Sequence, residues 1–499
     1  MDSIHSLKFF SPKAAAGIIV LSGLSFSQCG EVGKEDNRPN FLFIMLDDQP
    51  FDAFEHAGRY PFLQLPHLDR LHQESVTFNN FFCTASICSP SRASFLTGTY
   101  PHIHGVNQNH PRVDPNWDDY PPYSVHLQKN GYQTAFVGKI HMAHLPGRSH
   151  IRPGFDYWLS FNGQGEYFNP ELNENGREFV EQGYMTDILT DYAERWLREF
   201  REPGKPFHLA LWHKAVHEPY TPPDRHRDLY AGEKLPEPPY GTHLETFEGK
   251  PEWQRIKAYD SNWRNYEPVP SLPVKEWNPY NSRYMTLLRC ISAIDESVGH
   301  ILELLEELDL LDNTVIIYTS DNGYFMGEHT YWDKRIAYEN SIRIPMMIRY
   351  PKRFQPGLQV EDMGLNVDVA PTILEMAGIR VPSHMQGRSL LPVLTGEQKG
   401  ALRESFLFQY WMDDAYPYAG PDQVAVRTTR YKYVDSFLEN DINELYDLEK
   451  DPGEMNNLIN NPAYADVLAD MKQEQQRLIQ KLGYHRDRDF WLRKVVGEN

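Results

Sequence analysis

Cysteine is scarce in this chain, with 4 residues among 499. Cys29 lies close to the N-terminus, and the three that remain are too few for a disulfide-rich scaffold. Cys83 and Cys290 could still form a disulfide, although the sequence alone does not show it. The remaining residue, Cys88, has no His or second Cys at metal-ligand spacing beside it. The role of this thiol therefore has to come from the rest of the sequence.

Long hydrophobic runs and an excess of cationic residues are also missing. The apolar run from Ala14 to Phe26 is shorter than the roughly 20 residues that span a bilayer, and no later segment predicts an integral membrane span. The 49 Lys and Arg residues against 69 Asp and Glu residues give a net charge of −20. Such a field repels phosphates, which argues against nucleic acid and anionic membranes as partners. A small anionic substrate is not excluded, because a few cations in a pocket dominate at short range.

The N-terminus has the features of an export signal. Lys8 and Lys13 precede the apolar run, as in secretory signal peptides. Cys29 follows the run as in bacterial lipoproteins, but Gln28 stands where a small residue is preferred. We predict a signal peptide over residues 1–28 and an exported protein, periplasmic or extracellular. Lipid attachment at Cys29 stays open as an alternative.

Strands and helices are predicted to alternate from residue 40 onward. The runs "NFLFIMLDD" and "NTVIIYTSDNG" are continuously apolar, which is typical of strands buried on both faces. The segments "YSVHLQKNG", "TDILTDYAERWLREF" (capped at Thr186 or Asp187) and "MTLLRCISAIDESVGHILELLEEL" have helical periodicity. This alternation predicts an α/β sheet covered by helices on both faces. Residues 218–280 are rich in Pro and aromatic residues, and we predict a long loop region near a binding site there.

The pattern changes after about residue 400. The segments "VAVRTTRYKYVDS" and "INELYDLEKDPGEMNNL" predict short strands of period two, a turn and a last helix. We therefore predict a large domain over residues 38–400 and a small α+β subdomain with a short antiparallel sheet over residues 401–499.

Two predicted strands end on pairs of oxygen-rich side chains. Asp47 and Asp48 follow "FLFIML", and Asp321 and Asn322 follow "VIIYTS". Ligands of open α/β sheets bind at the carboxyl ends of strands, so the two pairs converge if both strands end at the same edge. Three neighbouring carboxylates need a cation, and oxygen ligands suit Ca²⁺ or Mg²⁺ rather than Zn²⁺. A helix cap at Asp48 and an Asn-Gly turn in "SDNG" stay open as structural alternatives.

Four cationic or titratable side chains follow strands in the same way. Lys139 and His141 lie two residues apart in "VGKIH" and share a face if this segment is extended. His217 follows "PFHLALW", and Lys334 comes shortly after the second oxygen-rich pair. Each residue taken alone is more often a surface or capping residue. Together with a metal ion they suit sulfuryl or phosphoryl transfer, because cations neutralise the oxygens and a His protonates the leaving alcohol.

The segment "CSPSRASFLTG" carries the pattern Cys-x-Pro-x-Arg from Cys88 to Arg92. It resembles the signature of type I sulfatases of the alkaline phosphatase superfamily, in which a maturation enzyme converts the Cys to formylglycine. The resemblance extends over residues 38–460, from "PNFLFIMLDDQ" through "TSDNG" to "ELYDLEKDPGE". One departure is "GKIH", because the family usually has Trp between the Lys and the His. Both functional positions are kept.

The resemblance implies a fold, cofactors and a role for each candidate residue. The fold is an alkaline-phosphatase-like large mixed sheet with helices on both faces. Cys88, as formylglycine, supplies the nucleophile and contributes an oxygen to a Ca²⁺ (or Mg²⁺) ion. The other implied metal ligands are Asp47, Asp48, Asp321 and Asn322. The implied catalytic residues are Arg92, which steadies the aldehyde hydrate; Lys139 and Lys334, which bind sulfate oxygens; His141, which assists sulfate elimination; and His217 or Lys334, which protonates the leaving group.

Similarity outside the motif indicates a class of substrate. The segments "RPGFDYWLSFNGQGEYFNPELNENG" and "GEHTYWDKRIAYENSIRIPMMIRYP" are similar to N-acetylglucosamine-6-sulfatases acting on mucin or glycosaminoglycan chains. We therefore predict hydrolysis of a 6-O-sulfate on N-acetylglucosamine in such a glycan. Specificity is expected from aromatic loops such as residues 157–168 and from Tyr331, Trp332, His384 and Arg388, with packing as the structural alternative for each.

Three other functions stay open. The chain could be a sulfatase for another polysaccharide, such as an algal one, or a phosphodiester or phosphonate monoester hydrolase of the same superfamily. A surface glycan-binding lipoprotein without catalysis would explain the export signal and the aromatic residues. It would not need Cys88, both acid pairs and the four cations. The predicted partners are therefore a sulfated carbohydrate and the maturation enzyme.

Overall fold

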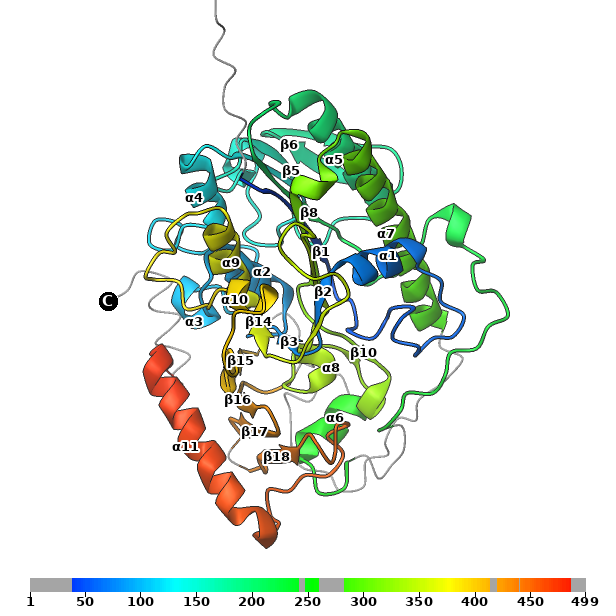
Figure 1. Cartoon of the computed structure of the whole chain (residues 1–499). Helices are drawn as coiled ribbons and strands as arrows, with labels where there is room; N and C mark the ends of the chain where they lie inside the picture. Colours follow the sequence, from blue (N-terminus) through cyan, green and yellow to red (C-terminus); the bar gives the residue numbers. More distant parts are fainter. Residues whose placement is uncertain (1–37, 242–246, 260–281, 413–419, 439, 486–499) are drawn as a thin grey trace, which may run out of the picture. The chain divides into compact units, whose positions relative to one another are not determined.

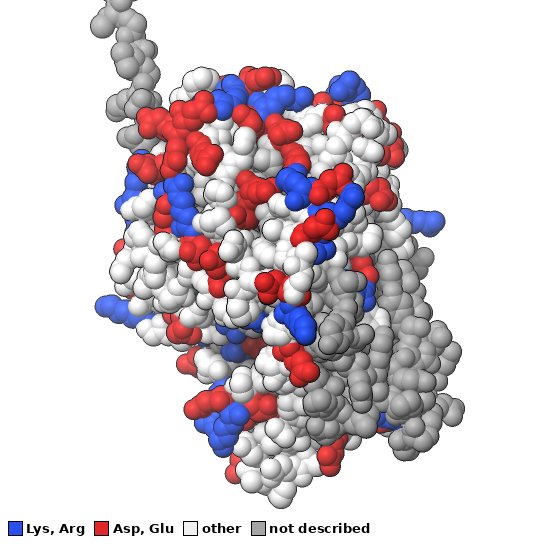
Figure 2. Space-filling view, turned by 90° about the vertical axis from the view of Figure 1, so that its right-hand side faces the viewer, with Lys and Arg blue, Asp and Glu red and all other residues white. Residues whose placement is uncertain are grey.

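The computed structural model describes residues 38–241, 247–259, 282–412, 420–438 and 440–485 (Figure 1). The predicted signal peptide and Cys29 lie outside these residues. No helix in the described ranges is long and apolar enough to cross a membrane. On the face shown in Figure 2, acidic and basic side chains are interspersed rather than gathered into one patch of either sign.

A ten-stranded mixed sheet forms the centre of the fold, in the order β13-β2-β12-β9-β1-β8-β4-β5-β6-β7. Its five middle strands, from β9 to β5, are mutually parallel, and antiparallel strands flank them on both sides. This confirms the predicted large mixed sheet. The strands are β1 (Asn40–Leu46), β2 (Val76–Phe78), β4 (Gln133–Lys139), β5 (Tyr157–Phe161), β6 (Glu171–Glu174), β7 (Arg177–Val180), β8 (Phe207–Trp212), β9 (Thr314–Ser320), β12 (Met346–Arg349) and β13 (Gln359–Val360).

Helices cover both faces of the large sheet, as the sequence predicts (Figure 1). Side chains of β1 alternate between the two layers: Phe41 packs on one side and Leu42 on the other. Both faces of this strand are therefore apolar, and for that reason its sequence shows no polar alternation. One layer holds α1 (Pro66–Glu74), α5 (Met185–Arg195) and α7 (Ser282–Glu307), and the other holds α2 (Cys88–Thr97), α4 (Tyr123–Lys129) and α9 (Val369–Met376).

A second, four-stranded antiparallel sheet follows in the order β15-β16-β17-β18. It consists of β15 (Ser405–Tyr410), β16 (Gln423–Thr428), β17 (Tyr431–Ser436) and β18 (Glu444–Asp447), and α11 (Ala465–Leu482) packs against it. The predicted boundary at residue 400 falls between α10 (Leu391–Leu394) and β15. The two sheets share one hydrophobic core, which contains Phe41 and Phe43 of β1 together with Phe406 and Phe408 of β15.

Three details differ from the sequence-based expectations. Helix α5 begins at Met185 with extended Tyr184 as its N-cap, so the predicted caps Thr186 and Asp187 lie inside its first turn. Helix α6 (Glu252–Tyr259) interrupts the predicted loop region 218–280, because the fully buried Trp253 packs in a small apolar cluster. Cys83 and Cys290 are free thiols in core clusters on opposite faces of the sheet, so they do not pair.

Candidate active site

Loops from neighbouring strands converge at one edge of the large sheet. Asp47 and Asp48 directly follow β1, and Asp321 and Asn322 directly follow β9. These strands pair in parallel, with Leu46 opposite Ser320, so the two oxygen-rich pairs emerge side by side. Lys139 ends β4, and His217 lies in the loop after β8, at the same edge. The carboxyl ends of parallel strands thus bring these distant side chains together.

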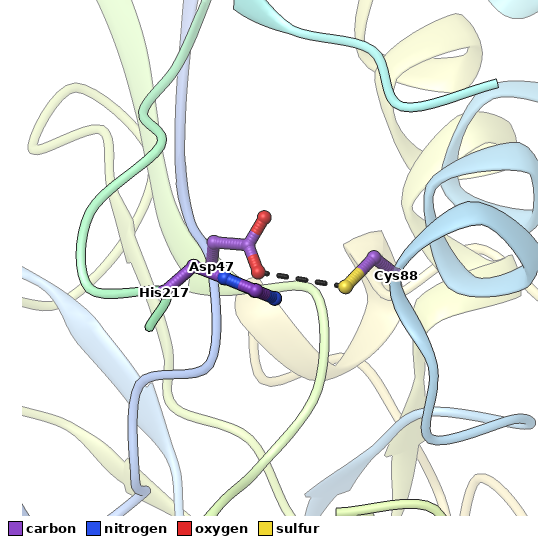
Figure 3. A group of neighbouring side chains, drawn as sticks. All are labelled: Asp47, Cys88 and His217. Carbon is purple, nitrogen blue, oxygen red and sulfur yellow. Dashed lines mark hydrogen bonds between the residues drawn. The ribbon is translucent and has the colours of Figure 1, made fainter. Parts of the chain in front are cut away.

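The acidic side chains surround Cys88, the first residue of α2. One ligand atom each of Asp47, Asp48, Cys88 and Asp321 lies within 4.8 Å of the others, and all four residues are buried. The Cys88 thiol lies 3.5 Å from Oδ1 of Asp47. One ring nitrogen of His217 also lies within 4.8 Å of a carboxylate oxygen of Asp47 and of the Cys88 sulfur. The His217 ring points toward the space between these two side chains (Figure 3).

Arg92 lies inside α2 and hydrogen-bonds to two of these carboxylates, which fixes their positions relative to each other. Its Nε donates to Asp321 Oδ2 at 2.8 Å, and one terminal nitrogen donates to Asp47 Oδ2 at 2.9 Å. Its other terminal nitrogen donates to the carbonyl oxygen of Lys139 at 2.6 Å. The planar guanidinium group provides this geometry, and Arg92 has no exposed surface.

Two lysines complete the charge balance of the cluster. The Lys139 ammonium pairs with Asp47, and the Lys334 ammonium pairs with Asp48. Lys334 Nζ also lies 3.3 Å from the Cys88 sulfur. Three carboxylates therefore face three cations in a buried volume, where an uncompensated charge would be costly.

Burial and the neighbouring charges also determine which side chains of the cluster are protonated. Burial raises the pKa of Asp48 to about 7, against the opposing effect of Lys334. Burial acts in the same direction on Asp47, but Lys139 and Arg92 hold the pKa of that carboxyl well below its usual range. Burial also raises the pKa of the Cys88 thiol far above neutrality. An unmodified Cys88 is therefore a neutral thiol and a poor nucleophile.

Loss of the Arg92 charge is expected to destabilise the fold. In Arg92→Met, Asp47 and Asp321 lose their shared partner, so with metal removed by a chelator the free energy of unfolding should fall by about 3–5 kcal/mol. Urea denaturation measures this change. Arg198→Met, which removes an exposed guanidinium paired with Glu194 and Glu307, is the control and should leave stability unchanged. An Arg92 variant as stable as the wild type would contradict the inferred role.

The donor set fits a hard divalent cation. Three carboxylates meet the amide of Asn322, whose Nδ2 donates to Asp48 Oδ1 at 2.7 Å. In this orientation the amide oxygen Oδ1 of Asn322 is buried and has no hydrogen-bond partner among the residues that the structure describes. An ion that prefers oxygen ligands, such as Ca²⁺, would coordinate this buried oxygen together with the three neighbouring carboxylates.

Two histidines border the cluster from different loops. The Nδ1 atom of His217 lies 2.5 Å from the carbonyl oxygen of Glu218. Because a carbonyl only accepts, this nitrogen carries a hydrogen, and Nε2, 3.7 Å from Asp48 Oδ2, is the atom that can exchange a proton. His141 follows β4 with a positive φ of 52° and is fixed by Ser89, whose hydroxyl donates to its carbonyl oxygen. No group in the described part of the chain hydrogen-bonds its own Nδ1.

Two cavities open beside this cluster and share Asn109 and Gln164 as lining residues. The first, of about 100 Å³, is also lined by Asp48, His217, Glu218, Tyr324, Trp332, Asp333, Lys334 and Arg335. The second, of about 250 Å³, is also lined by Ser89, His110, Pro111, His141, Met142, His144 and Gly163. A ligand in these cavities would reach both histidines and the lysine next to Cys88.

The structure places the predicted substrate-binding residues in different regions. Trp332 lines the first cavity. His384 and Arg388 line neither cavity: His384 contacts Tyr120 with ring centroids 5.9 Å apart, and the Arg388 guanidinium donates to the carbonyl oxygen of Leu402. Tyr331 is buried in the small apolar cluster around Trp253.

Several residues that line the cavities were not predicted from the sequence. Asp333 and Arg335 flank Lys334 in "DKR", and this run of charges beside a predicted catalytic lysine was an available signal. Gln164, which accepts a hydrogen bond from Lys139, lies in the loop 157–168 from which specificity was expected, although it was not singled out there. Asn109 carries no such signal, because only the fold brings it to the backbone N–H of Ser89, which donates to its Oδ1 at 2.9 Å.

The family profile described as "Sulfatase" matches residues 39–379. The chain belongs to the sulfatase family. A second profile, described as the C-terminal part of N-sulphoglucosamine sulphohydrolase, matches residues 327–481 of this sulfatase. The first profile covers the large sheet and the acid pairs, and the second covers the antiparallel sheet and α11.

Three similar proteins put this sulfatase in context. It is 32% identical to N-acetylglucosamine-6-O-sulfatase of Bacteroides thetaiotaomicron over 91% of its chain and 89% of that protein. It is 31% identical to choline-sulfatase of Rhizobium meliloti over 85% of its chain and 83% of that protein. The solved structure of BT4656 in complex with its substrate D-glucosamine-2-N,6-O-disulfate matches with a TM-score of 0.79 at 31% identity, over 90% of this chain and 99% of that one. The two relatives are named for different substrates, yet their percentage identities to this chain are nearly equal, so identity alone does not decide the substrate.

Proposed function

We propose that this sulfatase hydrolyses a sulfate ester on a carbohydrate, namely the 6-O-sulfate of N-acetylglucosamine or glucosamine in a mucin or glycosaminoglycan-type glycan. The observation that carries the proposal is Cys88, in a Cys-x-Pro-x-Arg pattern, inside a buried group of three carboxylates, two lysines and His217. The N-acetylglucosamine-6-O-sulfatase relative and the glucosamine disulfate bound to BT4656 support the choice of sugar.

The proposed cofactors are a divalent ion, Ca²⁺ in the first instance, and formylglycine made from Cys88. Asp47, Asp48, Asp321 and Asn322 would hold the ion together with residue 88. When present, the ion and the formylglycine hydrate would supply a hydroxyl nucleophile for attack on sulfur, which the neutral thiol of an unmodified Cys88 does not offer.

The residues around Cys88 have complementary roles in this proposal. Lys139 and Lys334 each carry three donors on one ammonium group, so each can contact a carboxylate and a sulfate oxygen at once. Arg92 fixes Asp47 and Asp321 and thereby keeps both carboxylates facing residue 88. His217 lines the first cavity and, when both of its ring nitrogens carry a hydrogen, would give the Nε2 proton to the leaving sugar oxygen; the ammonium group of Lys334, which lines the same cavity, is the alternative donor. His141, in the second cavity, is placed to accept a proton when sulfate leaves.

Polar groups on the wall of the first cavity suit a sugar. Trp332 offers an apolar face, while Asn109, Gln164 and Glu218 offer donors and acceptors for hydroxyl groups. Specificity residues of this kind are expected to hydrogen-bond sugar hydroxyls, which choline sulfate lacks.

Sulfate release from a panel of esters tests the proposal. The mature, Ca²⁺-loaded enzyme is expected to release sulfate from 6-sulfated N-acetylglucosamine at least about 100-fold faster, in kcat/KM, than from choline sulfate. Ion chromatography of sulfate measures the rates, and aryl phosphate diesters form a further arm. No release from the 6-sulfated sugar would discard this substrate, and faster cleavage of the diesters would favour a phosphodiesterase instead.

Two further parts of the proposal concern maturation and location. Mass spectrometry of the peptide that spans residue 88 should show formylglycine in place of Cys after expression with a maturation enzyme. The N-terminal sequence supports export to the periplasm or cell surface, where sulfated glycans are met. A cleaved N-terminus in protein purified from the exported fraction would support this location.

A further inference from the structure

Lys214 is a buried amine that the roles above leave unexplained. It lies two residues beyond β8, and only 1% of its surface is exposed. Among the described residues, none accepts a hydrogen bond from its Nζ, and it lines neither cavity beside Cys88. A buried ammonium group without a hydrogen-bond partner is costly, so its presence needs a physical reason.

The ring of Tyr167 connects Lys214 to His217. Nζ of Lys214 lies 4.5 Å from the centroid of this ring, which is the geometry of a cation–π contact. The hydroxyl of Tyr167 donates to the carbonyl oxygen of His217 at 2.8 Å. Tyr167 itself is buried and stacks on Tyr184, with ring centroids 5.8 Å apart and planes 15° from parallel. Lys214 and His217 therefore both contact one fixed aromatic side chain.

The backbone from Lys214 to His217 forms a turn attached to a metal-site residue. The His217 N–H donates to the carbonyl oxygen of Lys214 at 3.1 Å. Ala215 O accepts from Asp47 N at 3.0 Å, and Val216 N donates to Asp47 O at 2.7 Å. The Asp47 backbone thus fixes one side of the turn. The contacts of Lys214 and His217 with Tyr167 fix the other.

We propose that Lys214 is a positioning residue, which keeps Tyr167 and the turn in the place that directs His217 Nε2 toward the space beside Cys88. The inference rests on the proposed function, in which His217 protonates the leaving alcohol. Lys214 contacts neither the reacting atoms nor the sugar. Its loss should therefore lower the rate of the chemical step and leave binding of the substrate almost unchanged.

Kinetics of the holoenzyme test this role. Lys214→Met keeps the length of the side chain and removes its charge. It should lower kcat about 10- to 100-fold and change KM by less than about threefold. Lys214→Arg places another cation over the ring and should restore most of kcat. Tyr167→Phe keeps the ring but loses the hydrogen bond to His217, so it should also lower kcat with KM unchanged. Lys205→Met, at an exposed lysine whose nearest partner is Glu202 at 3.5 Å, is the matched control.

The decisive measurement repeats Lys214→Met in a His217→Ala background. If Lys214 acts through His217, the second substitution should lower the residual kcat by less than about twofold. The inference is overturned if the loss is the same in both backgrounds, if KM rises while kcat stays constant, or if neither changes. Should Lys214→Met not fold, Lys214→Arg and Tyr167→Phe decide the question, and an unchanged kcat in Tyr167→Phe overturns the proposal.

The activity of the wild-type enzyme distinguishes a failure of this inference from a failure of the proposed function. All variants are compared on whichever sulfate ester of the panel the wild type cleaves. A wild type that releases sulfate from another sugar corrects the proposed substrate alone. A wild-type enzyme that cleaves no ester of the panel overturns both the proposed function and the role of Lys214. If the wild type is active but Lys214→Met lowers kcat equally with His217 present and in the His217→Ala background, only the role of Lys214 is overturned.

Discussion

Replacement of Cys88 by Ala should abolish sulfate release, with kcat reduced by at least about 10⁴-fold, while the protein still folds. The physical reason is that the neighbouring carboxylates, lysines and His217 can position an ester but cannot supply the attacking atom. Sulfate release by ion chromatography measures the loss, and the melting temperature shows that the fold persists. An unchanged rate in this variant would end the proposed mechanism.

A serine at position 88 sharpens this test. Cys88→Ser offers one hydroxyl at this position, whereas a formylglycine hydrate offers two, so the serine can accept a sulfuryl group but has no second hydroxyl to expel it. We expect at most one turnover and a mass gain of one SO₃ group on the peptide that contains residue 88. Cys83→Ala is the matched control, since Cys83 is also a buried free thiol but its sulfur contacts the carbonyl oxygen of Ile342. It should retain most of the activity.

Removal of the divalent ion should abolish activity and also lower stability. Without an ion, the buried oxygens of Asp47, Asp48, Asp321 and Asn322 lose a common ligand. A ligand present at 100 times its dissociation constant stabilises the native state by about 2.7 kcal/mol. Calcium added to chelator-treated enzyme should therefore raise the melting temperature by several degrees and restore sulfate release. Differential scanning fluorimetry gives a readout that does not depend on activity.

Substitutions in the acid pairs test whether the ion binds at this site. Asp321→Asn keeps the shape of the side chain but removes one charge, so the shift in melting temperature should need a much higher Ca²⁺ concentration. Glu307→Gln, an exposed acid in the described part of α7, should leave the shift unchanged. Equal shifts in the two variants would place the ion elsewhere. The same titration with Mg²⁺ compares the two candidate ions.

Some features of this sulfatase could be predicted from local sequence alone. The apolar runs of β1 and β9 predicted buried strands, because both faces of each strand contact helices. The acids that follow them predicted a metal site, because polar residues at the end of a buried strand mark the edge of a sheet. The roles of Arg92, the lysines and the histidines came instead from the family resemblance, and the structure brings all of them to the same edge.

Other features depended on contacts between distant segments. His384 and Arg388 carry suitable chemistry in the sequence, yet they lie outside both cavities, while Asn109 and Gln164 line them. Trp253 forms part of a helix inside a predicted loop because it packs against Ile336 and its neighbours. Cap positions at Thr186 and Asp187 fitted the local pattern, but α5 starts at Met185, two or three residues earlier than those caps require.

The sequence by itself determined the strands, the acid pairs at their ends and the Cys-x-Pro-x-Arg segment, because each depends on neighbouring residues in the chain. Only the tertiary structure decided which residues surround Cys88, which line the cavities, and that Lys214 and His217 meet on Tyr167. The reason is that strand pairing and side-chain packing join residues far apart in sequence, and no local pattern encodes those distances.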